Sequence, residues 1–402
     1  MPLSVLQEPR KMKTGRVNRS FLRPHMAELQ TLRGLACLAV LFFHGLWWYI
    51  PKDAVGVAGL LRNLTAEWHR GVGLFFVLSG MLITGILRDS RNRPDYFSRF
   101  YKRRALRILP VYYMILILLA LYGVPKSFLE LSLLHAANMA PMLGIFMAYG
   151  PLWSLAVEEQ FYLMWPAFVR RFSNQTIAFI SIGVFVNSVI LTLMLRTNSP
   201  MASYPIWYAA HGLALGDLLA LYLRSRWASR SNVWNLATGF WLAGSALVWL
   251  SRTTWVRPQV GMALGCGWDF IFAAVLLFGL LLGTSQFEAW TRPRWLQFFG
   301  DISYGLYVIH VLIFMVYRRM FRPGDGLSAI LLQFVVCAGI SIGLATLSRF
   351  TVEAWFLGLK DKPLWRLAEN RAPASSDSSK RNSLCVLFSA PGCDSSKESL
   401  VE

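Results

Sequence analysis

Long apolar runs recur along the chain and predict its main elements. A helix needs about 20 apolar residues to cross the ~30 Å hydrocarbon core of a bilayer. Ten runs in the sequence approach or exceed that length, covering approximately residues 32–50, 70–87, 106–123, 152–169, 176–195, 205–223, 233–250, 261–283, 297–316 and 327–348. Short polar segments separate them. The pattern predicts an all-α fold, a polytopic membrane helix bundle of about ten transmembrane helices.

One further apolar stretch, residues 127–150, does not fit this pattern. It is interrupted by Glu130, His135, Asn138 and Pro141. Charged and helix-breaking residues are disfavoured in a lipid-exposed span. We expect this stretch to form a re-entrant or interfacial segment.

The composition supports a membrane protein with a polar tail at each end. Hydrophobic residues make up 55% of the 402 positions and charged residues only 15%, well below the proportion in soluble proteins. The sequence divides into a basic tail at 1–26, a membrane domain at 27–355 and a polar tail at 356–402, which we expect to be disordered.

The net charge of +19 agrees better with membrane topology than with nucleic-acid binding, because the basic residues flank the apolar runs. Of the 40 Lys and Arg residues, 29 lie in the tails and even-numbered loops and 10 in the odd-numbered loops, with Arg33 inside the first run. The positive-inside rule therefore predicts that both termini are cytoplasmic. The basic loop at 318–322 violates the pattern.

The first run contains the first candidate for chemistry. Arg33 and His44 are eleven positions apart, which is about 20° past three helical turns, so they share a face about 16 Å apart along the axis. Ionisable side chains at membrane depth are costly and therefore candidates for function. The structural alternatives are an arginine that reaches the membrane surface and a hydrogen-bonded core histidine.

Two other runs place polar groups at a depth similar to that of His44. Glu158 is about six residues from the outer end of the fourth run, and His310 lies near the same level in the ninth. A histidine beside a carboxylate is a workable general base, and we expect either Glu158 or Glu159, but not both, to face His44. The alternative is a polar network that only joins the helices.

Several sequence stretches together resemble one family. The segment ELQTLRGLACLAVLFFH (28–44) is similar to the opening helix of the acyltransferase family 3 membrane enzymes, with its arginine, ten residues and histidine. GVGLFFVLSGMLIT (71–84), FYKRRALRILPVYY (100–113), LWSLAVEEQFYLMWP (152–166) and FGDISYGLYVIH (299–310) resemble later motifs in the family's order. The resemblance covers about residues 27–355. It departs from the family at Gln30, where many members carry an acidic residue.

The resemblance implies O-acylation, commonly O-acetylation, of a hydroxyl on a bacterial surface glycan or glycolipid, with acyl-coenzyme A as donor. Arg33 and His44 match the signature pair, and Arg104 and Arg107 match the basic loop motif. Together with Arg103, these arginines are candidates for binding the phosphates of the donor, because guanidinium forks suit phosphate groups. The catalytic candidates are His44, Glu158, Glu159 and His310.

Polar residues outside the proposed catalytic group are candidates for binding the acceptor. Glu67, His69, Arg70 and Tyr307 are candidates for orienting a sugar, whereas His211 and Asp217 are assigned to helix packing. The sequence lacks HExxH, CxxC and phosphate-loop motifs, so no metal site is predicted. The partners expected are acyl-coenzyme A, a glycan or glycolipid and the bilayer, with the bacterial inner membrane as location. The rivals are a transporter or flippase and an acyltransferase acting on a lipid or small molecule.

Overall fold

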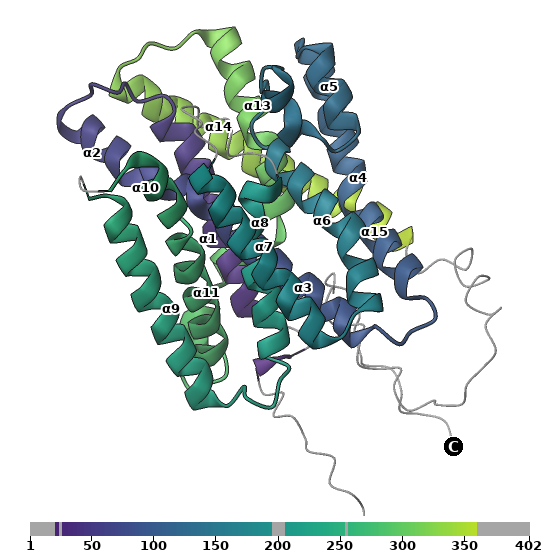
Figure 1. The fold of residues 1–402 in the computed structure, drawn as a ribbon. Helices are drawn as coiled ribbons and strands as arrows, with labels where there is room; N and C mark the ends of the chain where they lie inside the picture. The colour runs from purple at the N-terminus through teal and green to yellow at the C-terminus, as the bar shows by residue number, and fades with distance from the viewer. Residues whose placement is uncertain (1–20, 24–25, 195–205, 254–255, 360–402) are drawn as a thin grey trace, which may run out of the picture.

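The computed structural model describes residues 21–23, 26–194, 206–253 and 256–359 (Figure 1). Within these ranges all regular elements are helices. The tails predicted at 1–26 and 356–402 lie mostly outside the described residues. At the C-terminal boundary, α15 (Ala354–Gly358) continues the helical structure past residue 355.

Each of the ten apolar runs contains a helix. They are α1 (Ala27–Phe42), α3 (Gly71–Asp89), α4 (Tyr96–Tyr122), α6 (Leu152–Arg171), α7 (Asn174–Met194), α8 (Ile206–Tyr222), α9 (Arg230–Ser251), α11 (Gly267–Leu282), α13 (Ser303–Phe321) and α14 (Leu327–Ser348). In the described part of the chain, eight helices are long and apolar enough to cross a membrane. Of the ten, only α6 and α8 fall outside this group; α6 carries two internal glutamates and α8 has a shorter apolar stretch. The protein is an integral, multi-pass membrane protein.

Shorter helices connect the spans. They are α2 (Gly56–Thr65), α5 (Lys126–Leu133), α10 (Pro258–Leu264), α12 (Arg294–Asp301) and 3-10 turns at Ala66–Arg70, Ala137–Leu143 and Glu288–Thr291. The stretch 127–150 thus forms a short helix and a 3-10 turn rather than a span. The run 297–316, predicted as one helix, is instead divided between α12 and α13 at Ile302.

The division at Ile302 accompanies close packing of α12 on α1. A side chain at Gly34 would collide with the backbone of Leu296 and Gly300, and a side chain at Gly300 would collide with the backbone of Gln30. Small residues permit this backbone approach between helices in membranes. The contact fixes the N-terminal part of α1, and with it the neighbouring Arg33.

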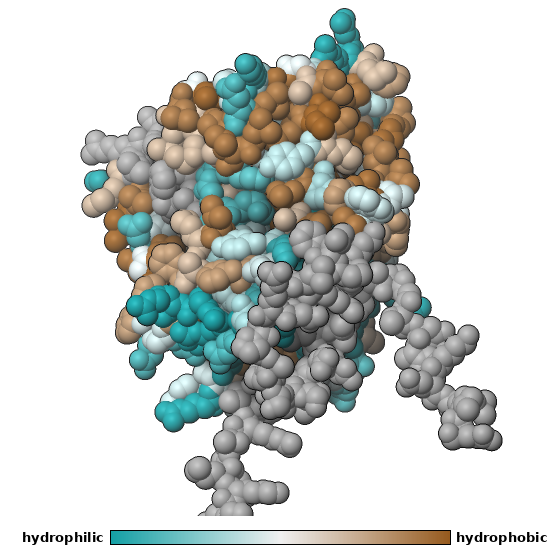
Figure 2. All heavy atoms as spheres, turned by 90° about the vertical axis from the view of Figure 1, so that its right-hand side faces the viewer, coloured by the Kyte–Doolittle hydropathy of each residue, from teal (hydrophilic) through white to brown (hydrophobic). Residues whose placement is uncertain are grey.

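Two lines of evidence show the surface that faces lipid. Large apolar side chains such as Phe179 on α7, Leu242 on α9 and Leu332 on α14 are exposed. Figure 2 shows another face, on which hydrophobic residues predominate around a hydrophilic hollow, while hydrophilic residues gather toward the lower edge. A broad apolar surface with polar ends is what a bilayer requires.

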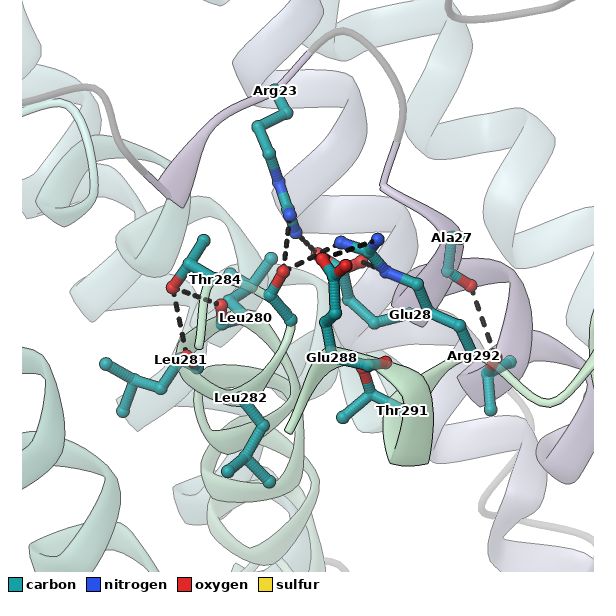
Figure 3. Close-up of polar contacts among 12 residues, drawn as sticks. Arg23, Ala27, Glu28, Leu280, Leu281, Leu282, Thr284, Glu288, Thr291 and Arg292 are labelled. Atoms are coloured by element: carbon teal, nitrogen blue, oxygen red, sulfur yellow. Dashed lines mark hydrogen bonds and ion pairs between the residues drawn. The ribbon is translucent and has the colours of Figure 1, made fainter. Parts of the chain in front are cut away.

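A buried carboxylate ties the start of α1 to the segment after α11 (Figure 3). The Glu28 side chain is only 1% exposed, and its two oxygens contact the guanidinium groups of Arg23 and Arg292. Both arginines also donate to the carbonyl oxygen of Gly283, Arg23 at 2.5 Å and Arg292 at 2.7 Å. The cluster joins three chain segments at the end of the bundle that holds Arg33.

Replacing Glu28 by glutamine is expected to destabilise this end of the bundle. The change leaves the partly buried Arg23 guanidinium without its counter-charge, whereas Arg292 keeps its ion pair with Glu288. The expected cost is about 2 kcal/mol. Thermal unfolding in lipid nanodiscs measures the effect. Glu288→Gln is the matched control, because Glu288 is exposed and pairs only with Arg292 among the described residues, so its loss should cost less than about 1 kcal/mol. Equal unfolding temperatures for the two variants would contradict the role of Glu28.

Candidate active site

A cavity of about 330 Å³ lies between α1, α3, α4, α6, α13 and the segment after α14. It is on the side of the bundle where α1 begins, the side predicted to be cytoplasmic. Its charged lining residues are four arginines and four acids: Arg33, Arg104, Arg107, Arg349, Glu158, Glu159, Asp301 and Glu353. Arg33 makes no hydrogen bond or ion pair with any described residue, so its donors remain available to a ligand.

The N-terminal turns of α4 deliver two of these arginines. Arg104 and Arg107 are three residues apart and line the cavity from one helix face. The Arg104 guanidinium lies 4.1 Å from the centre of the Tyr162 ring, an arrangement that favours the cation. Arg103, predicted as a third phosphate contact, is not part of the lining. The rotation of about 100° per residue carries it away.

The turn before α4 is held by Asp95. Arg93 donates to both carboxylate oxygens of Asp95, at 2.8 and 3.1 Å, and Arg99 lies one helical turn further on, 3.6 Å from the carboxylate. Partial burial alone would raise the pKa of the Asp95 carboxyl, but these hydrogen bonds and charges hold it below its ordinary value. Asp95 therefore stays ionised and fixes the start of the helix that carries Arg104 and Arg107.

Glu158 binds neighbours other than the expected histidine. Its carboxylate accepts hydrogen bonds from Ser79 at 3.0 Å and Tyr162 at 2.9 Å. Glu158 and Glu159 both line the cavity, whereas His44, which only one of them was expected to face, is not a lining residue. The expected pairing of a carboxylate with His44 is also not what the structure shows. Counting residues from the end of a span predicts depth only approximately.

His44 instead pairs with His310. His310 Nε2 is 3.1 Å from His44 Nδ1, and the ring centres are 5.0 Å apart. His44 lies in a π-helical turn, Phe43–Trp47, that continues α1, and such turns occur frequently at functional sites. His310 comes from α13 and is 1% exposed, so the dyad joins two spans that are 266 positions apart in the sequence.

The hydrogen bonds of the two rings define where their protons lie. Nδ1 of His310 is 3.0 Å from the carbonyl oxygen of Leu306, and Nδ1 of His44 is 3.1 Å from that of Val40. A carbonyl oxygen only accepts, so in the neutral rings both Nδ1 atoms carry the proton. His310 Nε2 is then an acceptor for His44 Nδ1–H. His44 Nε2 has a lone pair and no hydrogen-bond partner among the described residues, which is the state that a general base requires.

Tyr307 connects the cavity to the histidine dyad. It lines the cavity, and its hydroxyl is 2.6 Å from Ser154 Oγ. Its ring centre is 6.0 Å from that of His310, less than one helical turn further along α13. Tyr307, predicted to orient a sugar, thus lines the same cavity as the arginines predicted to bind the donor.

The other three acceptor candidates lie at the opposite end of α1 from Arg33. Glu67 accepts from Arg70 at 2.5 Å and forms an ion pair with Arg252 at 2.9 Å. His69 is nearer the dyad, because the Phe43 ring lies 5.1 Å from both the His69 and the His44 rings. Glu67 and Arg70 are therefore engaged with each other, and His69 borders the outer approach to His44.

Arg349 and Glu353 are lining residues that the sequence reasoning did not identify. They lie in a π-helical turn, Arg349–Glu353, directly after α14, and Glu353 is 4% exposed. The available signal in the sequence was a glutamate among apolar residues just past the last run. Of the residues assigned to packing, His211 forms an ion pair with Asp269 at 2.5 Å, and Asp217 accepts from Thr84.

Among the described residues, no group of three or more His, Cys, Asp or Glu side chains is arranged to hold a metal ion.

Comparison with known proteins identifies the family. The family described as an acyltransferase domain, acyltransferase 3, matches residues 26–349. This range contains all the predicted site residues and spans most of the chain, so the chain belongs to this family. No solved structure matches the chain significantly.

Curated relatives occur in several organisms, and two of the three described here are named as acyltransferases. Peptidoglycan O-acetyltransferase OatA of Listeria monocytogenes is 31% identical over 176 residues, 38% of this chain and 25% of that protein. Acyltransferase MdmB of Streptomyces mycarofaciens is 25% identical over 390 residues, 88% of this chain and 95% of that protein. Nodulation protein 10 of Rhizobium leguminosarum is 25% identical over 324 residues, 72% of this chain and 83% of that protein. The chain thus spans a quarter of the Listeria relative and nearly all of the Streptomyces one.

Proposed function

We propose that the protein transfers an acyl group, commonly acetyl, from acyl-coenzyme A to a hydroxyl of an extracytoplasmic glycan or glycolipid. The observation that carries the proposal is the arginine-lined cavity whose deep end borders the His44–His310 dyad. The donor site lies at the Arg33 end of α1, and the base lies toward the opposite end. This arrangement suits transfer of an acyl group across a membrane. Relatives named peptidoglycan O-acetyltransferases support a glycan acceptor.

The donor occupies the cavity in this proposal. Arg33, Arg104, Arg107 and Arg349 supply charge-assisted hydrogen bonds to the phosphates of the coenzyme. A volume of about 330 Å³ is at the lower end of the range for small-molecule pockets, so it holds the acylated arm while the nucleotide stays at the mouth. The mouth faces the cytoplasm, in agreement with the positive-inside pattern and with a bacterial inner-membrane location.

The chemical step uses His44 Nε2 as general base. It takes the proton of the acceptor hydroxyl while that oxygen attacks the thioester carbonyl carbon. The carbon–sulfur bond then breaks, and the leaving thiolate takes the proton back, giving an ester and free coenzyme A. His310 Nε2 accepts from His44 Nδ1–H and so stabilises the imidazolium that forms. Tyr307 is the candidate donor to the developing oxyanion.

The test uses purified protein in nanodiscs with radiolabelled acetyl-coenzyme A and soluble glycan oligomers. We expect acceptor-dependent release of the coenzyme thiol, with one acyl group appearing on the glycan for each thiol released. Ester products found only on lipid or on small molecules would correct the acceptor class. Movement of a glycolipid across liposomes without any thioester consumption would establish a transporter instead.

A further inference from the structure

A second pocket, of about 470 Å³, opens at the end of α1 opposite to Arg33. It is lined by Trp47, Trp48, Tyr49, Lys52, Arg62 and Asp325, together with two intervening residues. Three consecutive aromatic residues thus meet one carboxylate and two cations. Pockets lined by aromatic rings with a few polar groups are the usual form of small-molecule sites.

The residues around the pocket are held in place. Arg62 donates to the carbonyl oxygens of Trp47 at 2.7 Å and Ile50 at 2.5 Å, and its guanidinium lies 4.5 Å from the Trp47 ring centre. Arg318 lies over the Tyr49 ring at 4.6 Å and donates to Asp325 at 3.1 Å. These contacts engage Arg62 and Asp325 and orient the segment that presents the tryptophans.

Trp48 combines exposure with closeness to the base. Its side chain is 63% exposed, and its ring centre is 5.9 Å from that of His44. The face of an aromatic ring is electron-rich and attracts the weakly positive C–H groups of a sugar ring, while Asp325 can accept bonds from sugar hydroxyls. A pyranose stacked on the exposed Trp48 ring would therefore lie close to the His44 ring.

We infer that this outer pocket is the acceptor subsite and that it binds a pyranose ring of the glycan by stacking on Trp48. The inference rests on the proposed function and adds to it the place and chemical class of the acceptor. Exposed tryptophans also gather at the surfaces of membranes, where they contact lipid headgroups. The experiment must separate these two roles of Trp48.

Saturation-transfer NMR with protein in nanodiscs tests binding directly, using the β-1,4-linked tetramer of N-acetylglucosamine as probe. We expect signals from the C–H protons of one sugar face with wild type. Trp48→Ala should lose them, and Trp48→Phe should restore at least half. Trp290→Ala is the matched control, because Trp290 is 85% exposed in a turn on the Arg33 side. Loss of signal in that control alone, or no face-selective signal with wild type, would overturn the subsite.

Kinetics distinguish failure of the subsite from failure of the proposed function. Trp48→Ala should raise the apparent KM for the acceptor at least about tenfold and leave the apparent KM for acetyl-coenzyme A unchanged. An unchanged acceptor KM in an active Trp48→Ala enzyme overturns the subsite and leaves the function standing. Face-selective binding by a wild-type protein that transfers no acyl group overturns the function and supports the subsite.

Discussion

Replacing His44 by alanine is expected to lower turnover about 10²- to 10⁴-fold, because that is the contribution of a general base. The structure gives the reason for choosing this residue: His44 Nδ1 is engaged by Val40 and His310, which leaves Nε2 as the basic atom. Single-turnover transfer from acetyl-coenzyme A to a glycan oligomer measures the effect. Donor binding should stay near the wild-type value, since His44 does not line the cavity.

Two further histidine variants sharpen this test. His310→Gln should reduce turnover less than His44→Ala, because it removes a positioning partner and leaves the base, and it should alter the pH profile of turnover. His135→Asn is the control, because His135 stacks on Tyr112 away from the dyad and its positive φ of 52° suits asparagine. Retention of more than about a tenth of wild-type turnover by His44→Ala at equal abundance would remove His44 from the role of base.

Hydrophobic pattern alone was enough for the fold class, and the reason is physical. A bilayer forces every spanning backbone to satisfy its hydrogen bonds internally, so a long apolar run has few alternatives to a helix. Each of the ten runs indeed holds one. The hydrophobic pattern did not predict the helix break at Ile302, because the pattern does not report contacts between distant segments. The break accompanies the contact of Gly300 with the backbone at Gln30, about 270 positions away.

The candidate site was predictable in part. The regular rise of a helix placed Arg33 and His44 well apart on the first span. In the structure Arg33 lines the cavity and His44, in the π-helical turn that continues α1, is part of the dyad. For residues on different helices, the sequence indicated only how deep each residue lies in the membrane. This depth correctly predicted that His310 lies near His44. It also predicted Glu158 at the level of His44, whereas Ser79 and Tyr162 bind the Glu158 carboxylate.

The missing part of the site came from the segment that continues the last span beyond the predicted run. Arg349 and Glu353 follow the last run, and nothing in their local sequence indicates that the chain turns back to Arg107 and Arg33. Arg349 and Glu353 complete the lining of the cavity, which holds four arginines and four acids. The acids limit the repulsion among the arginines and lower the net positive charge that a ligand carrying phosphate groups meets. This arrangement favours a donor that binds and leaves readily.

Replacing Arg33 by alanine is expected to raise the apparent KM for acyl-coenzyme A about 10- to 150-fold, the value of a hydrogen bond to a charged group. Arg33→Lys keeps the charge and loses the planar fork, so its KM should lie between those of alanine and wild type. Steady-state kinetics with saturating acceptor measure both. Arg171→Ala is the control for lost basic charge on the same side of the bundle, because Arg171 is exposed at the end of α6 and is not a lining residue.

Combining the Arg33 and His44 changes separates donor binding from chemistry. The two residues are about three helical turns apart, and residues without shared contacts act additively. Arg33→Lys should therefore raise the donor KM by the same factor in the wild-type and His44→Ala backgrounds, while His44→Ala lowers turnover in both. A donor KM that changes with His44, or a turnover that falls with Arg33→Lys at saturating donor, would mean that one group of residues does both tasks. Separate tasks require that the acylated arm of the donor reach from Arg33 past Tyr307 to the dyad.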